Sequence, residues 1–103
     1  MRRLRRGDLV QVITGADAPK RGKVLRVEVE DGLVVVQGIN LVYKHIRRSQ
    51  KYPQGGRIQK EAPINISNVM LVDPDEDRPV RVKMGKDDQG RKVRVSVRTG
   101  KPI

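Results

Sequence analysis

The amino-acid sequence predicts an all-β protein built as a small antiparallel barrel, with a protruding basic loop and a C-terminal β-hairpin extension. Two observations predict this class. Short runs rich in valine and isoleucine recur along the 103 residues and are separated by glycine-containing turns. In the clearest run, apolar and charged residues alternate with the period of two that a half-buried strand requires. The chain suffices for one domain, whose core must be aliphatic because phenylalanine and tryptophan are absent.

Residues 1–6 form a basic N-terminal arm with four arginines, too charged to pack against a core. The arm is either a solvated tail or a contact for phosphate groups, and the charge of the whole chain favours the second. The barrel is expected to span 7–73, because four short strands follow in the first half. A barrel of this size avoids exposed sheet edges by closing on itself. The four strands are expected at 9–13, 25–30, 33–36 and 39–43.

The second of these strands has the clearest pattern. Leu25, Val27 and Val29 are predicted on the buried face, and the charged residues between them face solvent. Asp31-Gly32 follows directly and is a strong hairpin signal, because glycine tolerates the positive φ of a two-residue turn. We therefore expect a tight hairpin between this strand and the next.

Residues 44–60 are predicted to be a long basic loop within the barrel region. The segment contains six lysines and arginines and no acid, and Pro53-Gln54-Gly55-Gly56 breaks it in the middle. Such a loop is costly to order and repels itself, so an anionic partner is the physical reason we favour over simple solvation. A tight turn at Ser67-Asn68 and a last strand at 69–72 then close the barrel.

Residues 74–103 are predicted to form an acidic linker and a C-terminal hairpin. The four carboxylates between 73 and 77 lack the ligand spacing of a calcium loop, so a solvated linker is expected there. Valines alternate with cationic residues along 80–84 and again along 93–98. We therefore expect one valine face, packed on the barrel or a partner, and one cationic face.

The formal charge of +11, from 23 lysines and arginines against 12 acids, favours a polyanionic partner and opposes homo-oligomers. Nucleic acid is the expected partner. A membrane surface is disfavoured because no apolar run approaches about 20 residues and no basic amphipathic helix is visible. The lack of a signal-peptide pattern and of cysteine agrees with a cytoplasmic protein.

Catalysis, cofactor binding and metal binding are not expected. The chain has one histidine, His45, no cysteine, and no paired carboxylates in an apolar setting. Gly22-Lys23 lacks the glycine spacing and the hydroxyl residue of a phosphate loop. Two tyrosines cannot build the aromatic platform of a single-strand binder. Cationic contact with the backbone of structured nucleic acid remains.

Several motifs resemble those of a known family. Gly7-Asp8-Leu9-Val10, Gly22-Lys23-Val24 and Val36-Gln37-Gly38-Ile39-Asn40 resemble the KOW motif. That motif alone is only moderately specific, because transcription elongation factors share it. Glu61-Ala62-Pro63-Ile64 and Ser67-Asn68-Val69 make the chain similar to bacterial large-subunit ribosomal protein number twenty-four, essentially from end to end.

This resemblance implies an SH3-like barrel that binds the 5′ region of large-subunit (23S) ribosomal RNA in the cytoplasmic ribosome. It also implies an early role in subunit assembly, a loop near the exit of the nascent-chain tunnel, and neighbouring large-subunit proteins as partners, with no small-molecule substrate. The alternative is a KOW module of an elongation factor that binds polymerase or nascent RNA. The high charge throughout and the single predicted domain disfavour it.

Two departures from the family pattern matter. Ala18-Pro19 stands where relatives often have glycine, which should stiffen the loop. No cysteine lies at 73–79, so no zinc is expected. The candidate RNA contacts come from the arm, the KOW turn, the basic loop and, more weakly, the tight turn. They are Arg2, Arg3, Arg5, Arg6, Lys20, Arg21, Lys23, Lys44, His45, Arg47, Arg48, Lys51, Arg57, Lys60 and Asn68.

Overall fold

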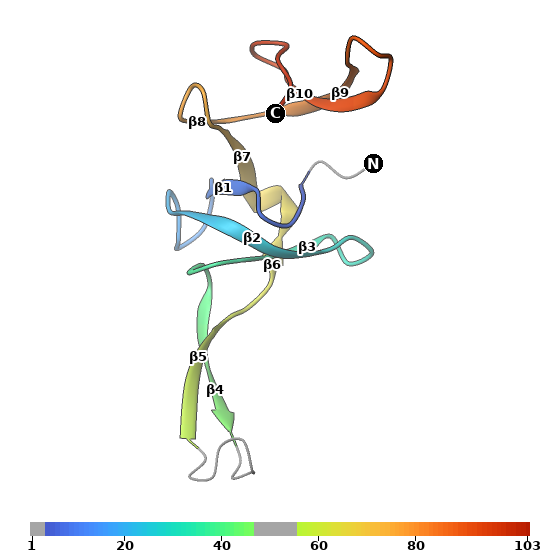
Figure 1. Ribbon diagram of the computed structural model, residues 1–103. Coiled ribbons are helices and arrows are strands. Elements are labelled where there is room, and N and C mark those ends of the chain that lie inside the picture. Colours follow the sequence, from blue (N-terminus) through green and yellow to red (C-terminus); the bar gives the residue numbers. More distant parts are fainter. Residues whose placement is uncertain (1–3, 47–55) are drawn as a thin grey trace.

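The computed structural model describes residues 4–46 and 56–103 (Figure 1). Within these ranges the chain forms strands and one short 3₁₀ helix, so the predicted all-β class is confirmed. In chain order the elements are β1 (Leu9–Val12), β2 (Arg21–Glu28), β3 (Leu33–Val36), β4 (Leu41–Ile46), β5 (Gly56–Glu61), β6 (Ile64–Asn65), η1 (Ile66–Asn68), β7 (Val69–Asp73), β8 (Arg78–Val80), β9 (Val82–Lys86) and β10 (Lys92–Ser96).

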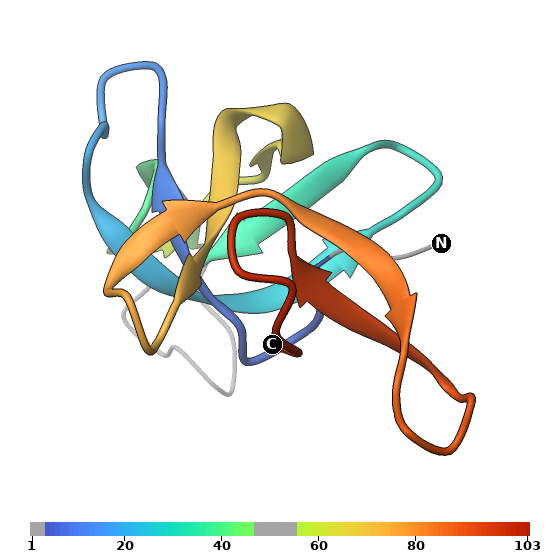
Figure 2. The same ribbon diagram turned by 90° about the horizontal axis from the view of Figure 1, so that it is seen from above.

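Six strands form one antiparallel sheet in the order β6-β3-β2-β1-β7-β8. The view in Figure 2 shows this sheet strongly curled, as in a small SH3-like barrel. The expected closure by a continuous ladder is not found, since in the described part of the chain no pairing joins the edge strands β6 and β8. The strands β4 and β5, and likewise β9 and β10, form separate two-stranded ribbons.

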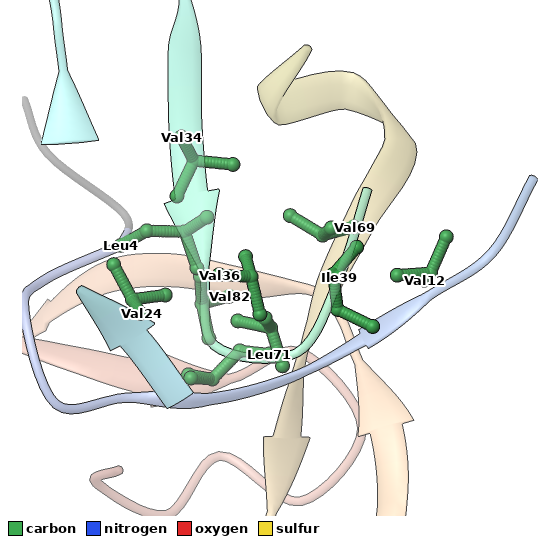
Figure 3. Packing of buried hydrophobic residues seen from close by; sticks show 10 residues of the cluster. Leu4, Val12, Val24, Val34, Val36, Ile39, Val69, Leu71 and Val82 are labelled. Carbon is green, nitrogen blue, oxygen red and sulfur yellow. The ribbon is translucent and has the colours of Figure 1, made fainter. Parts of the chain in front are cut away.

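The core is an aliphatic cluster inside the curl of the sheet, and Figure 3 shows its side chains pointing toward one another. Many small side chains replace the missing aromatic ones, each contributing through about 25 cal/mol per Å² of buried apolar area. Leu4 is 6% exposed within it, so the prediction that the arm is too charged to pack is wrong at this residue. The buried members are Leu4, Val10, Val12, Val24, Val34, Val36, Ile39, Val69, Leu71 and Val82.

The buried face of β2 differs from the prediction. Val27 is partly buried against the core, as predicted, but Val24 is 1% exposed, whereas Leu25 and Val29 are 40% and 48% exposed. Leu25 lies at an irregularity in the pairing with β3, where Val24 lies opposite Val36 but Arg26 lies opposite Val35, and Val29 lies beyond the end of β2. A bulge of this kind inserts one residue and moves the following side chains to the other face.

The strand predicted at 33–36 is confirmed as β3, but the connections on either side differ from the prediction. Glu28 lies opposite Leu33, so the β2–β3 connection contains four residues rather than two. Gly32 has the expected positive φ, at 65°. After β3, Ile39 is buried in a turn, and the next strand begins only at Leu41.

The described ends of the segment predicted as a basic loop are paired strands. Its first residues, 44–46, belong to β4, and its last, 56–60, belong to β5. The two strands pair in regular antiparallel register from Leu41 opposite Glu61 to Ile46 opposite Gly56. β4 contains Val42, Tyr43 and Ile46, residue types that favour strands, even though the charge of the segment indicated a loop. The ribbon projects from the main sheet (Figure 1).

The C-terminal hairpin is present as β9 paired with β10, but its faces differ from the prediction. Val95 lies opposite Lys83, so a valine of one strand and a lysine of the other share a face. The pairing register, which the turn at 87–91 sets, is not encoded in the alternation of either strand. Val95 is buried because the last residues fold back and Pro102 pairs with it.

A buried ion pair joins this hairpin to the sheet. The Arg94 guanidinium donates to both carboxylate oxygens of Asp8, at 2.6 and 3.1 Å. The two side chains are 7% and 13% exposed. Asp8 also accepts the backbone N–H of Arg5 at 2.6 Å, so one carboxylate fixes the start of the chain and the C-terminal hairpin.

The acidic cluster forms the turn between β7 and β8. Asp73 is buried, and its carboxylate accepts the backbone N–H of Asp75 at 2.9 Å. The expectation of a fully solvated linker is therefore wrong at Asp73. The main sheet continues through β8, and the proposed division of the chain at residue 73 stays a prediction.

Candidate nucleic-acid interface

The candidate interface is centred on the β4–β5 ribbon. Directly opposite residues of an antiparallel pair share a face of the ribbon. Lys60 lies opposite Val42 and Lys44 lies opposite Ile58, so the two lysines occupy one face. Arg57 lies on the other face. All three cationic residues are exposed.

The other candidates of the 44–60 segment lie partly or wholly outside the described residues. His45 is a residue of β4, opposite Arg57, but its side chain falls outside the described part. Arg47, Arg48 and Lys51 lie outside the described residues.

The cations of the ribbon that the structure describes form no salt bridge. Across residues 4–46 and 56–103, six ion pairs are formed, and none includes Lys44, Arg57 or Lys60. Two exposed lysines on one face of a narrow ribbon therefore keep their charge available for an anionic partner.

The cations of the predicted KOW turn are arranged differently. Arg21 and Lys23 belong to β2 rather than to the turn, which lies at 13–20. Lys20 is 3.4 Å from the Asp17 carboxylate. Arg21 donates to the Asp77 carboxylate at 2.5 Å, to the Asp77 carbonyl at 3.0 Å, and to a side-chain oxygen of Gln11 at 2.9 Å.

Arg21 thus connects β2 to the β7–β8 turn. An exposed pair of this kind contributes little to stability, about 0–1 kcal/mol, but it competes with any phosphate for the guanidinium. Lys23 is exposed and, unlike Lys20 and Arg21, has no ion-pair partner within the described ranges. Lys23 is therefore the cation of this group most available to RNA.

Asn40 fixes the base of the ribbon, a role that the sequence analysis missed. It has a positive φ of 53°, which asparagine tolerates better than most residues. Its backbone N–H donates to the Asp17 carboxylate at 2.9 Å, and its side-chain amide donates to the carbonyls of Ala62 and Pro63 at 3.4 and 3.3 Å. The sequence indicated this role through the position of Asn40, directly after Gly38-Ile39 in the segment that resembles the KOW motif.

Glu61 provides a second brace at the end of β5. Its carboxylate accepts the backbone N–H of Gly38 at 3.0 Å. This hydrogen bond is the main reason that the pKa of Glu61 lies below its ordinary value, and the charge of Lys60 acts in the same direction. The single acid of the ribbon is therefore ionised near neutral pH and engaged at the base.

The remaining predicted contacts are the arginines of the arm and Asn68. Arg5 and Arg6 are exposed beside β2, because Gly7 donates its backbone N–H to the Val24 carbonyl at 2.8 Å. Arg2 and Arg3 lie outside the described residues. Asn68 ends η1, and its backbone carbonyl accepts the N–H of Ile13 at 2.9 Å.

The structure thus joins two of the predicted groups. The β1–β2 turn meets the base of the ribbon through Asp17 and Asn40. The C-terminal hairpin lies at the opposite end of the molecule (Figure 1). It carries further exposed cations that were not predicted as contacts, among them Lys83, Lys86 and Lys92.

The described residues provide no constellation for metal or acid–base chemistry. They contain no group of three or more histidine, aspartate or glutamate side chains that could hold a metal ion. A groove of about 330 Å³ beside Leu4 and Val82 is lined by apolar residues together with Ser67 and Arg81, a set without an acid–base pair. The described residues therefore favour contact with an anion through exposed cationic side chains.

Comparison with known proteins agrees with this arrangement. Residues 39–103 match the family model described as large ribosomal subunit protein uL24, C-terminal domain. The chain is 51% identical to the uL24 protein of Halothermothrix orenii, over 89% of this chain and 88% of that protein. It is 50% identical to uL24 of Moorella thermoacetica, over 97% and 93%. For uL24 of Exiguobacterium sibiricum the identity is 45%, over 97% and 96%.

The chain belongs to the uL24 family. Membership confirms the resemblance and favours a ribosomal protein over the elongation-factor alternative. The uL24 family model begins at Ile39, so it includes the ribbon, and the similarity to whole uL24 proteins extends through β1 to β3. No helix in the described ranges is long and apolar enough to span a membrane.

Proposed function

We propose that the protein is a structural, non-catalytic constituent of the large subunit of the cytoplasmic ribosome. In this role it binds the 5′ region of 23S ribosomal RNA as an early assembly protein near the exit of the nascent-chain tunnel, beside other large-subunit proteins. Membership of the uL24 family supports the ribosomal assignment.

The observation that supports RNA contact most directly is the pair of exposed lysines on the ribbon. Lys44 and Lys60 share one face, carry no ion pair within the described ranges, and belong to a ribbon that projects from the main sheet (Figure 1). Lysine neutralises phosphate as a point charge and releases condensed counterions. Contacts of this kind position a protein on folded RNA without reading base sequence.

The braces at Asn40 and Glu61 give this surface its orientation. An isolated two-stranded ribbon is marginally stable in water, so its direction depends on how its base is held. Asn40 bonds to the β1–β2 turn and to the carbonyls of Ala62 and Pro63 just after β5, and Glu61 bonds to Gly38. The ribbon can therefore present Lys44 and Lys60 to the RNA in a fixed direction.

Replacing Lys44 and Lys60 together by alanine tests this assignment. The slope of log affinity against log salt for a 5′ fragment of 23S RNA is expected to decrease in magnitude by about 1.4 to 1.8, because two phosphate contacts are lost. Affinity near 0.1 M salt should fall by about tenfold or more. Filter binding or fluorescence anisotropy across a salt series measures both quantities.

A matched control removes the same charge elsewhere. Lys86 and Lys92 lie directly opposite each other on the C-terminal hairpin and are also exposed. Their double alanine variant should bind within about twofold of the unmodified chain. Equal losses in the two double variants would mean that net charge alone, and not the ribbon, determines binding.

A further inference from the structure

The second face of the ribbon carries an aromatic ring covered by a guanidinium. The Arg57 guanidinium carbon lies 4.2 Å from the centroid of the Tyr43 ring. Tyr43 lies opposite Gln59. Arg57 lies two residues before Gln59 on β5, on the same face and opposite residue 45. Diagonal neighbours on one face are within reach of aromatic and long side chains, and an arginine over a ring is attracted by the π-system.

This pair is not part of any core. Tyr43 is 59% exposed, and among the described residues no ring contact other than that of Arg57 is made to it. A large aromatic side chain loses favourable burial when it is left in water. On the projecting ribbon, the ring and the adjacent guanidinium of Arg57 are therefore accessible to a partner.

The chemistry of the pair favours a nucleotide as that partner. A nucleobase presents a flat π-face, which stacks on tyrosine rings and on arginine planes, and its phosphate is attracted by the adjacent cation. The pair lies on the face opposite Lys44 and Lys60. RNA that contacts those lysines through phosphates would need only to pass around the narrow ribbon to reach it.

We propose that Tyr43 and Arg57 form a stacking subsite for one unpaired nucleobase of the bound RNA. Because the guanidinium lies over one face of the ring, the base is expected to stack on the other ring face or on the guanidinium itself. This subsite rests on the proposed RNA-binding function and adds a base contact to its phosphate contacts.

Replacing Tyr43 by leucine separates stacking from charge. The variant keeps an apolar side chain, so the ribbon should retain its fold, but the π-face is lost. Affinity for the 5′ fragment of 23S RNA is expected to fall about tenfold, with the salt slope unchanged because no phosphate contact is removed. Arg57→Lys should weaken binding less, since it keeps the charge and loses only the plane.

A fluorescent variant reports stacking directly. The chain has no tryptophan, so Tyr43→Trp introduces a single indole whose emission should be quenched when the RNA fragment is added. Val97→Trp is the control, because Val97 is exposed and directly follows β10, which lies at the other end of the molecule from β4 and β5, so its indole should stay unquenched.

The outcomes distinguish the subsite from the function it rests on. A loss of affinity at constant salt slope, with quenching confined to position 43, supports the subsite. Normal RNA binding by Tyr43→Leu, without quenching of Tyr43→Trp, overturns it and leaves phosphate binding intact. Failure of the unmodified chain to bind the fragment overturns both proposals.

Discussion

Replacing Asp8 by alanine is expected to lower the free energy of unfolding by about 3–5 kcal/mol, because the buried Arg94 charge is left without its carboxylate. The same carboxylate accepts the Arg5 N–H, so the anchor of Leu4 in the core is weakened as well. Chemical denaturation at neutral pH measures the change.

The control for this variant is an exposed ion pair on the same hairpin. Arg91 lies 3.1 Å from the Asp87 carboxylate, and its side chain is largely exposed. Arg91→Ala should change the free energy of unfolding by about 1 kcal/mol or less. A loss of that size for Asp8→Ala would show that Arg94 finds solvent or another partner and that the pair does not join the hairpin to the sheet.

Gly22→Ala is expected to have the second large effect on stability, a loss of about 1–3 kcal/mol. A Cβ at this position would overlap the carbonyl oxygen of Gln37 and lie 2.9 Å from a methyl group of Val36. Gly22 is also paired with Val10, so β2 cannot retreat without disturbing β1. The position requires glycine because two backbones approach closely, and no unusual φ is involved.

Two neighbouring measurements test this explanation of Gly22. Lys23→Ala changes an exposed residue of the same strand and should stay within about 0.5 kcal/mol. Gly85→Ala would place its Cβ 3.2 Å from the side chain of Val95, which can shift, so a smaller loss than at Gly22 is expected. A Gly22 variant as stable as the Lys23 variant would contradict the close approach.

Local features of the fold could be read from the sequence, whereas pairings between distant segments could not. The strand at 33–36 follows from a valine run between two turns, and both predicted hairpins exist. The bulge after Val24 and the pairing of Val95 with Lys83 depend on register between strands, which alternation within one strand does not specify. The Asp8–Arg94 pair joins residues 86 positions apart, so no local pattern indicates it.

For the candidate site too, the sequence predicted the type of residue but not the contacts between distant residues. Composition identified cationic residues as the functional class and placed many of them in the 44–60 segment. It could not show that Asp77 engages Arg21 while Lys44 and Lys60 have no ion-pair partner within the described ranges. It also missed the stacked pair, because Tyr43 and Arg57 meet only when β4 and β5 form a ribbon instead of a loop.

The measurement that tests the central claim most directly is a comparison of two RNAs. The purified chain is titrated into a 5′ fragment of 23S RNA and into an unrelated structured RNA of equal length, across a salt series. Contact with about six to ten phosphates predicts that log affinity falls by about 0.7 to 0.9 per contact for each unit of log salt, with the 5′ fragment bound more tightly throughout. Equal affinity for the two RNAs, or affinity that does not depend on salt, would contradict specific binding to ribosomal RNA.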